Sequence, residues 1–182
     1  DKYNEVLLAR EPTRRATEIV SRLRGDSDPN SEAMAMAQGY IEDRKKHWDG
    51  VIEPILKKGV HVICDRFTLS TLAYQSTQGI QLETLRDMHT IRGIGSPEVT
   101  FYLDIPVSIA QERMKRRGDA PEKFDELEFQ KKLSEKYKEL IRISKIDNCL
   151  RDLIRRVDII NANQPIEELA RNIIRIYDAD IG

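Results

Sequence analysis

Four short runs of mainly apolar residues set the strongest limit on how this chain can fold. They read EVLLAR, VHVICDRF, VTFYLDI and VDIIN, and they span Glu5–Arg10, Val60–Phe67, Val99–Ile105 and Val157–Asn161. Three of them lack the alternation of apolar and polar residues that marks a strand with one face in water. The segments between them are long enough for crossover helices. The pattern predicts an α/β fold, with a parallel β-sheet flanked by helices on both faces.

Length and composition favour one soluble domain. A chain of 182 residues can build one well-packed core, and no linker, repeat or low-complexity tract divides it. The 30 basic and 31 acidic residues nearly cancel, so no general attraction to nucleic acid or membranes is expected. No apolar run approaches the roughly 20 residues of a membrane span. Because the two cysteines also lack metal-ligand spacing, we expect a reduced, cytoplasmic setting.

Helical patterns fill the segments between the runs. The sequence predicts helices over Ala16–Arg24, Ser31–Lys58, Ser108–Arg117, Asp125–Ser144 and Ile166–Tyr177. Gly59 ends the second of these, immediately before a predicted strand. Gly118 and Pro121 break the pattern after the third, so a loop is expected there.

A string of polar residues follows the second predicted strand. Residues 65–75 read DRFTLSTLAYQ, and they stand at the carboxyl end of a strand, where open parallel sheets bind ligands. Asp65 and Arg66 together suit a magnesium-bound nucleotide, since the acid can face the metal shell while the guanidinium grips phosphate oxygens. An isolated Asp-Arg pair is more often a structural ion pair, so the dipeptide alone is a weak motif.

The longer string is more specific, and it resembles the thymidylate kinase family. The family's motif at this strand end reads Asp-Arg-aromatic, then Ser, then Tyr or Phe and often Gln, and Ser70, Tyr74 and Gln75 stand at those positions. Arg10-Glu11-Pro12, the stretch Val51–Gly59 and the stretch Ser96–Asp104 match further family anchors in the same order. The likeness covers nearly the whole chain and implies the P-loop NTPase-like fold of nucleoside-monophosphate kinases.

What the resemblance implies is a phosphotransferase. ATP would donate its terminal phosphoryl group to dTMP in the presence of Mg²⁺, giving dTDP, and a homodimer is expected. Two alternatives stay open: another nucleoside-monophosphate or deoxynucleoside kinase, and a noncatalytic nucleotide-binding or dimerisation module. A serine or cysteine hydrolase is poorly supported, because His47, His61 and His89 have no obvious partners in the sequence.

The resemblance also implies an acceptor site. Arg66 would hold the acceptor phosphate, and Asp65 would lie in the magnesium and phosphate network. Tyr40 would stack on thymine while Arg44, four residues further along the same helix face, would reach a base carbonyl. Thr71 and Gln75 would read the base edge and Tyr74 would crowd the sugar. The complete implied set is Arg10, Arg14, Arg15, Tyr40, Arg44, Arg66, Ser70, Thr71, Tyr74 and Gln75.

Two further segments would serve the donor nucleotide. The basic run that ends at Arg116 and Arg117 matches the mobile lid of this kinase class, at about 113–125. An arginine brought in by a lid can stabilise the negative charge of phosphoryl transfer, so these two arginines are the catalytic candidates beside Asp65 and Arg66. Asn163 and Gln164 resemble the family's turn beside the donor adenine.

One element of such a kinase does not occur in residues 1–182. The pattern Gly-x-x-x-x-Gly-Lys-Ser/Thr, whose amides and lysine cradle the donor phosphates, is absent from this sequence. The resemblance places that loop upstream of residue 1, after a strand that lies between the second and third predicted strands. We therefore expect the slot for this strand to be filled by another segment, or the two neighbouring strands to close against each other.

Overall fold

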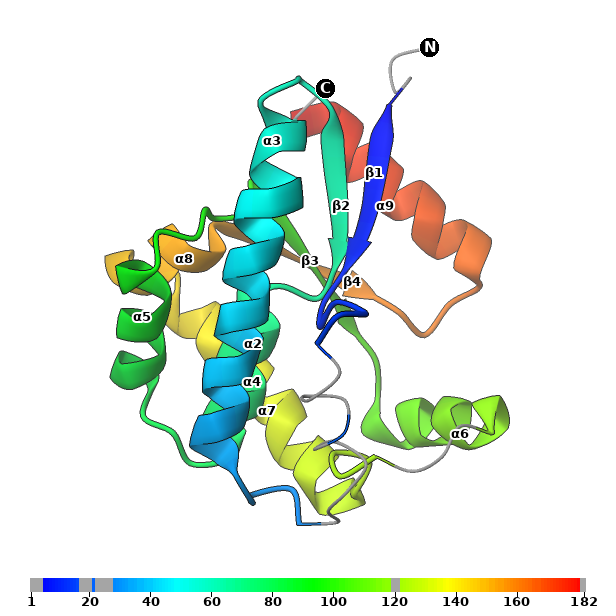
Figure 1. Ribbon diagram of the computed structural model, residues 1–182. Coiled ribbons are helices and arrows are strands. Elements are labelled where there is room, and N and C mark those ends of the chain that lie inside the picture. The colour runs from blue at the N-terminus through cyan, green and yellow to red at the C-terminus, as the bar shows by residue number, and fades with distance from the viewer. Residues whose placement is uncertain (1–4, 17–20, 22–27, 119–121, 181–182) are drawn as a thin grey trace.

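The computed structural model describes residues 5–16, 21, 28–118 and 122–180 (Figure 1). The predicted helix over Ala16–Arg24 lies almost entirely outside the described residues. All four predicted strands are present as β1 (Val6–Arg10), β2 (His61–Asp65), β3 (Val99–Asp104) and β4 (Arg156–Asn161). The α/β class is therefore confirmed.

The strands form two parallel pairs. In the first pair β1 lies beside β2, in a register that runs from Val6 opposite His61 to Arg10 opposite Asp65. In the second, β3 lies beside β4, and Val99 stands opposite Arg156. Parallel pairing brings the carboxyl ends of both members of a pair to one edge, which places Asp65 next to the end of β1.

The two pairs do not join into one sheet. Among the described residues no ladder links β2 to β3, so closure of these two strands against each other, one of the two expected outcomes, is wrong. Filling of the slot by a further segment stays a prediction. The helical layer connects the two strand pairs. β2 leads directly into α4 (Thr68–Thr77), while Tyr102 of β3 stacks on Tyr137 of α7 (Leu127–Ile143) with ring centroids 5.1 Å apart. Because α4 and α7 pack together, each strand pair is held by the helical layer instead of by a neighbouring strand.

The predicted helix over Ser31–Lys58 is present as three joined pieces. They are α2 (Ala33–His47), a π-helical turn η1 (Trp48–Ile52) and α3 (Glu53–Leu56). Pro54 lies in the first turn of α3, where its missing N–H is tolerated. Gly59 ends the segment with φ of 77°, the left-handed conformation that glycine adopts without strain.

The remaining helices complete the fold. They are α5 (Leu82–Ile91), α6 (Val107–Arg117), α8 (Asn148–Ile154) and α9 (Ile166–Asp180). A cluster of fully buried apolar side chains from α2, α4, α5, α7 and α8 forms the core, including Met36, Leu72, Leu85, Leu150 and Ile154. The core therefore lies mainly within the helical layer, beside the strands. No helix in the described part of the chain is long and apolar enough to cross a membrane.

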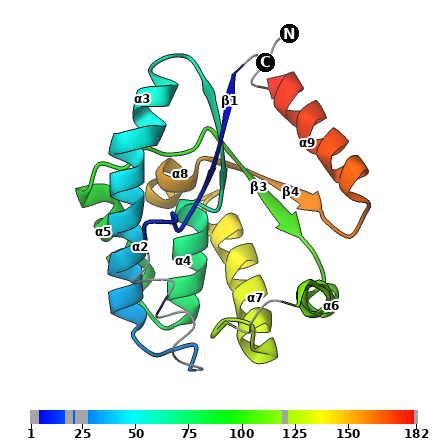
Figure 2. The same ribbon diagram turned by 45° about the vertical axis from the view of Figure 1, so that its right-hand side comes forward.

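Cover on both faces of the strands stays a prediction. In both views, α2, α4 and α5 lie on one side of β1 and β2, and α9 lies on the other (Figures 1 and 2). Yet Leu8 and Ile63, which stand opposite each other in the register of β1 and β2, are 76% and 61% exposed. Apolar strand residues normally face a packed layer, and here that layer is incomplete.

Candidate functional site

A buried arginine lies at the centre of the candidate site. Arg44 of α2 is 2% exposed, and its Nε donates to Oε2 of Glu11 at 2.6 Å. Its Nη1 lies 2.9 Å from Nε2 of His89, and its Nη2 donates to Oγ1 of Thr71 at 3.0 Å. The guanidinium carbon also lies 4.9 Å from the ring centroid of Phe67. Four segments that are far apart in the sequence therefore meet at one side chain.

The acid of the Arg-Glu-Pro turn anchors this arrangement. The N–H of Glu11 donates to the carbonyl of Asp65 at 3.0 Å, which extends the pairing of β1 with β2 by one residue. Its Oε1 lies 3.1 Å from Nδ1 of His47, on the last turn of α2. Two residues later, the N–H and hydroxyl of Thr13 donate to the carboxylate of Asp43 at 2.7 and 2.6 Å. The loop after β1 is thus held against α2 by two carboxylates.

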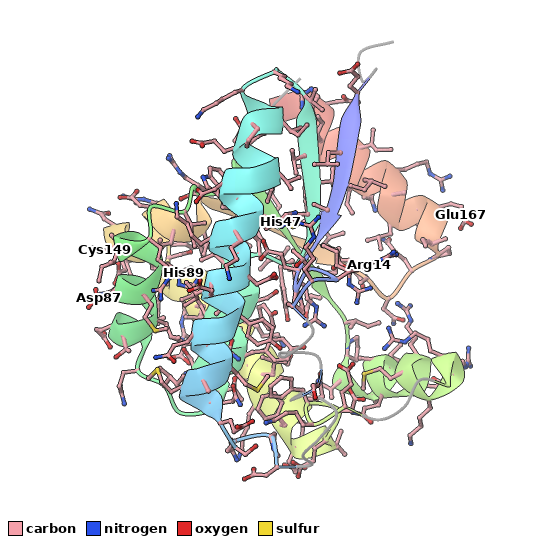
Figure 3. All side chains as sticks on the ribbon, viewed as in Figure 1. Arg14, His47, Asp87, His89, Cys149 and Glu167 are labelled. Atoms are coloured by element: carbon pink, nitrogen blue, oxygen red, sulfur yellow. The ribbon has the colours of Figure 1, made fainter. Side chains whose placement is uncertain are left out.

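His89 faces Arg44 from α5. Its Nδ1 lies 2.7 Å from the carbonyl oxygen of Leu85, which can only accept, so the hydrogen belongs on Nδ1. Nε2 is then free to accept from Arg44. Burial lowers the pKa of His89 to about 4, and the charge of Arg44 acts in the same direction, so the ring is neutral at physiological pH. Figure 3 shows His89 between α5 and α2, and His47 near the carboxyl ends of β1 and β2.

The Asp-Arg pair lies at the exposed carboxyl end of β2. Asp65 is the last residue of the strand, and its Oδ2 lies 3.5 Å from Nε of Arg10, the last residue of β1. Arg66 has φ of 69°, a left-handed conformation that is uncommon for a residue with a side chain. Its guanidinium carbon lies 5.2 Å from the ring centroid of Tyr74, which belongs to the following helix, α4. Strained backbone of this kind is frequent at ligand-binding positions.

Tyrosines surround Arg66. Burial raises the pKa of Tyr40, and the nearby Tyr74 acts in the same direction. The charge of Arg66 acts to lower this pKa. The ring of Tyr74 packs edge-on against Phe124, with centroids 5.1 Å apart, and against Tyr137. The hydroxyl of Tyr137 donates to Oγ of Ser70 at 3.1 Å. The aromatic residues therefore connect α4 with the end of the predicted lid segment, through Phe124, and with α7, through Tyr137.

Most of the predicted acceptor-site residues gather at this edge. The structure brings together, around the carboxyl ends of β1 and β2 and the first turns of α4, the side chains of Arg10, Tyr40, Arg44, Asp65, Arg66, Ser70, Thr71 and Tyr74. Arg14 and Arg15 lie exposed in the turn that follows β1, and Figure 3 labels Arg14 there.

Gln75 lies deeper than its neighbours. It is fully buried, and its Nε2 donates to Oε1 of Gln78 at 2.9 Å. Gln78 in turn donates to the carbonyl of Pro29 at 2.6 Å. These contacts connect α4 to the segment before α2, one turn further along α4 than Thr71. The Oε1 atom of Gln75 has no partner in the part of the chain that the structure describes.

The predicted donor-side residues lie apart from this cluster. Arg116 pairs with Glu112 of its own helix, Nη2 to Oε1, at 2.6 Å, and both side chains are exposed. Arg117 is exposed at the end of α6. Asn163 and Gln164 form the turn between β4 and α9, where the N–H of Asn163 donates to Oδ1 of Asn161 at 2.9 Å. The Nε2 atom of Gln164 is buried without an acceptor among the described residues.

The interpretation that the histidines lack partners is wrong. His89 contacts Arg44, His47 contacts Glu11, and Nδ1 of His61 lies 2.6 Å from the hydroxyl of Tyr177. The Arg-Glu-Pro match could have pointed to Glu11. No local signal marks the histidines, because their partners come from distant segments.

Lys123, which is not among the predicted site residues, lies buried at the end of the predicted lid segment. It is 3% exposed, and its Nζ donates to the carbonyl and hydroxyl oxygens of Ser31 at 3.0 and 2.8 Å. The end of the predicted lid segment is therefore attached to the segment that leads into α2.

A magnesium ion could find one protein ligand at this edge. Mg²⁺ is usually held by one or two carboxylates together with substrate phosphates and water. Asp65 offers an exposed carboxylate of that kind. Among the residues that the structure describes, no group of three or more His, Cys, Asp or Glu side chains is placed to hold a metal ion. Asp65 therefore fits an ion that arrives with its nucleotide.

Parallel strands with a carboxylate and arginines at their carboxyl ends, beside helices, are typical of α/β proteins that bind a ligand at that edge. The family model for thymidylate kinase matches residues 1–173. The chain is 36% identical over 178 residues to a thymidylate kinase of Wolbachia sp. subsp. Brugia malayi (strain TRS). The matched region covers 93% of this chain and 80% of that protein. It is 32% identical over 185 residues to a probable thymidylate kinase of Pyrococcus abyssi, with 97% and 83% covered. The chain belongs to the thymidylate kinase family, and so to the phosphotransferases.

Proposed function

We propose that the protein transfers the terminal phosphoryl group of ATP to dTMP and releases dTDP. The observation that carries the proposal is the convergence of Tyr40, Arg44, Arg66 and Tyr74 at the carboxyl ends of β1 and β2 in a member of this family. The set combines an aromatic ring for a base, a buried donor for a base carbonyl and an exposed cation for a phosphate.

Each of these side chains has a distinct task in the proposed site. Arg66, exposed and held beside Tyr74, grips the acceptor phosphate, and Arg10, Arg14 and Arg15 add positive charge nearby. Tyr40 stacks on thymine, and Arg44 donates to a base carbonyl next to Thr71. Tyr74 fills the space that a ribose 2′-hydroxyl would need. Asp65 would hold a magnesium ion that arrives with the nucleotide, and such an ion would neutralise charge on the phosphates.

The donor side is also part of the proposal. A lid at about 113–125 brings Arg116 or Arg117 to the transferring phosphoryl group, where an arginine can accelerate transfer by about 10³ to 10⁵. Arg116 would exchange its exposed pair with Glu112 for this contact, at small cost because exposed ion pairs are weak. The buried and unpartnered Nε2 of Gln164 supports a ligand beside the Asn163-Gln164 turn.

The cradle for the donor phosphates requires an element outside residues 1–182. We propose that a parallel strand leading into a phosphate-binding loop occupies the slot between β2 and β3. The unjoined edges of these two strands support this placement. Residues 1–182 would then belong to one kinase domain. A homodimer and a cytoplasmic location remain predictions from the sequence.

The test is to incubate the protein, with the proposed phosphate-binding loop present ahead of residues 1–182, with ATP, Mg²⁺ and each of dTMP, dUMP, dCMP and dGMP, and to measure the diphosphates by chromatography. Formation of dTDP in preference to the other diphosphates is the expected result. Binding of dTMP without any transfer would support the noncatalytic alternative. Preferential phosphorylation of another monophosphate would show a different kinase of the same class.

A further inference from the structure

Arg44 has more hydrogen-bond donors than its protein neighbours use. A guanidinium group carries five N–H bonds in a fixed planar fork. The bonds to Glu11, His89 and Thr71 use one hydrogen on each of its three nitrogens. One hydrogen on each terminal nitrogen is therefore left without an acceptor among the residues that the structure describes. Since Arg44 is buried, a ligand oxygen is the natural partner for these hydrogens.

The direction of the two remaining hydrogens depends on the contacts that orient the planar guanidinium group of Arg44. Glu11 fixes the Nε side, with a contact of 2.6 Å between two nearly fully buried groups. His89 fixes Nη1 from the opposite helix, and the bond from its own Nδ1 to Leu85 keeps the imidazole from turning. Thr71 orients less strictly, because a hydroxyl group rotates to suit its neighbours.

His89 can perform this task only as a neutral acceptor. If its Nε2 carried a hydrogen, two N–H groups would face each other at 2.9 Å, and the guanidinium would be displaced. The bond to Leu85 and the burial of the ring both favour the tautomer with hydrogen on Nδ1. The pairing of Arg44 with His89 is thus set by the packing of α5 against α2.

We infer that His89 is a positioning residue for base selection, which holds the Arg44 fork so that its remaining hydrogens meet a keto oxygen of the acceptor base. The inference rests on the proposed function and adds a residue that acts on base selection through Arg44. An amino group in the place of that oxygen would bring N–H against N–H and leave buried donors unpaired, which disfavours binding strongly. Cytosine differs from thymine in this way, so dCMP is the competitor that His89 excludes.

The experiment compares two substitutions of similar size. His89→Gln keeps an acceptor oxygen near the position of Nε2, and His89→Met fills the space without one. In the Met variant we expect the KM for dTMP to rise on the order of tenfold, with kcat changed by less than about twofold, because substrate binding and not the chemical step is affected. The preference for dTMP over dCMP, measured as the ratio of kcat/KM values, should fall by a similar factor, and the Gln variant should restore most of both.

Equal KM values and equal preferences in the two variants would show a purely structural role and overturn the inference, while leaving the proposed function intact. No phosphorylation of dTMP by the protein that carries the proposed phosphate-binding loop would overturn both. If the Met variant fails to fold, ¹⁵N NMR of the unmodified protein decides. A neutral His89 with hydrogen on Nδ1, and Arg44 Nη resonances that shift with dTMP but not with dCMP, would support the inference. Hydrogen on Nε2, or no such shift, would overturn it.

Discussion

Glu11 and Arg44 form an ion pair of 2.6 Å in which both side chains are almost fully buried. Removing one partner of such a pair leaves the other charge buried and unpaired, which typically costs about 3 to 5 kcal/mol. We therefore expect Glu11→Gln to lower the free energy of unfolding by about 3 kcal/mol. Urea unfolding, monitored by circular dichroism, measures this change.

An exposed pair on the same helix segment is the control. Lys45 and Asp49 lie 2.7 Å apart and are both partly exposed, so Asp49→Asn should cost less than about 0.5 kcal/mol. If Glu11→Gln and Asp49→Asn destabilise the protein equally, the Glu11–Arg44 pair does not stabilise the junction between β1 and α2.

The low pKa of His89 predicts a loss of stability in mild acid. An unfolded chain has a histidine pKa near 6.5, and burial lowers that of folded His89 to about 4. Between these pH values the unfolded chain binds a proton that the folded protein does not, so stability is complete above about pH 6.5 and falls as the pH approaches 4. The loss should reach about 3 kcal/mol.

Urea unfolding at several pH values between 4 and 7.5 measures this dependence. Because His89→Gln removes the titrating group, its stability should change less across the same range than that of the unmodified protein. Parallel pH profiles for the two proteins would contradict the assignment of the acid sensitivity to His89.

The strands and the Asp-Arg edge could be predicted because their signals are local. The apolar runs predicted the ends of β1 to β4 to within one or two residues, and the string that begins at Asp65 marked the end of β2. The partners of Arg44 could not be predicted in this way. His89 lies 45 residues from Arg44 in the sequence, and only the packing of α5 against α2 brings them together.

The open slot between β2 and β3 shows a different limit. The order of strands could be taken from the family resemblance, but whether β2 and β3 would close depended on the packing of α4 against α7. Such packing depends on the fit of many side chains, among them the stacked Tyr102 and Tyr137, and a one-dimensional pattern does not contain it.

Arg66 should contribute to substrate use far more than to folding. Its side chain is exposed at the carboxyl end of β2, so Arg66→Ala should leave the unfolding midpoint nearly unchanged. The kcat/KM for dTMP should fall on the order of a hundredfold, as expected for a cation that binds a phosphate in the site. Arg142→Ala, which removes an exposed arginine of α7, is the matched control. Normal turnover in Arg66→Ala would refute the assignment.

Tyr74 should select against ribonucleotides. In Tyr74→Ala, space opens beside the sugar position, and the preference for dTMP over ribothymidine monophosphate should decrease. The loss of ring contacts with Phe124 and Tyr137 should also cost about 3 kcal/mol of stability. Tyr74→Phe keeps the ring and should keep the preference. If the selectivity ratio is the same in the Ala variant, Tyr74 serves the core alone.

Residues 1–182, produced with nothing added at either end, should fold poorly and transfer no phosphate. β2 and β3 each have an edge with no strand beside it among the described residues, and the sequences of both suit burial on two faces. Each unsatisfied backbone group costs about 1 to 3 kcal/mol once it is shielded from water, so several together rival the roughly 5 to 15 kcal/mol that typically stabilises a whole domain.

The exposed Leu8 and Ile63 of residues 1–182 should bind an apolar dye such as ANS. We expect a broad urea transition with a low m-value, strong dye fluorescence and no formation of dTDP. A sharp transition together with normal dTMP phosphorylation would contradict both the proposed strand in the slot and the need for a separate phosphate-binding loop.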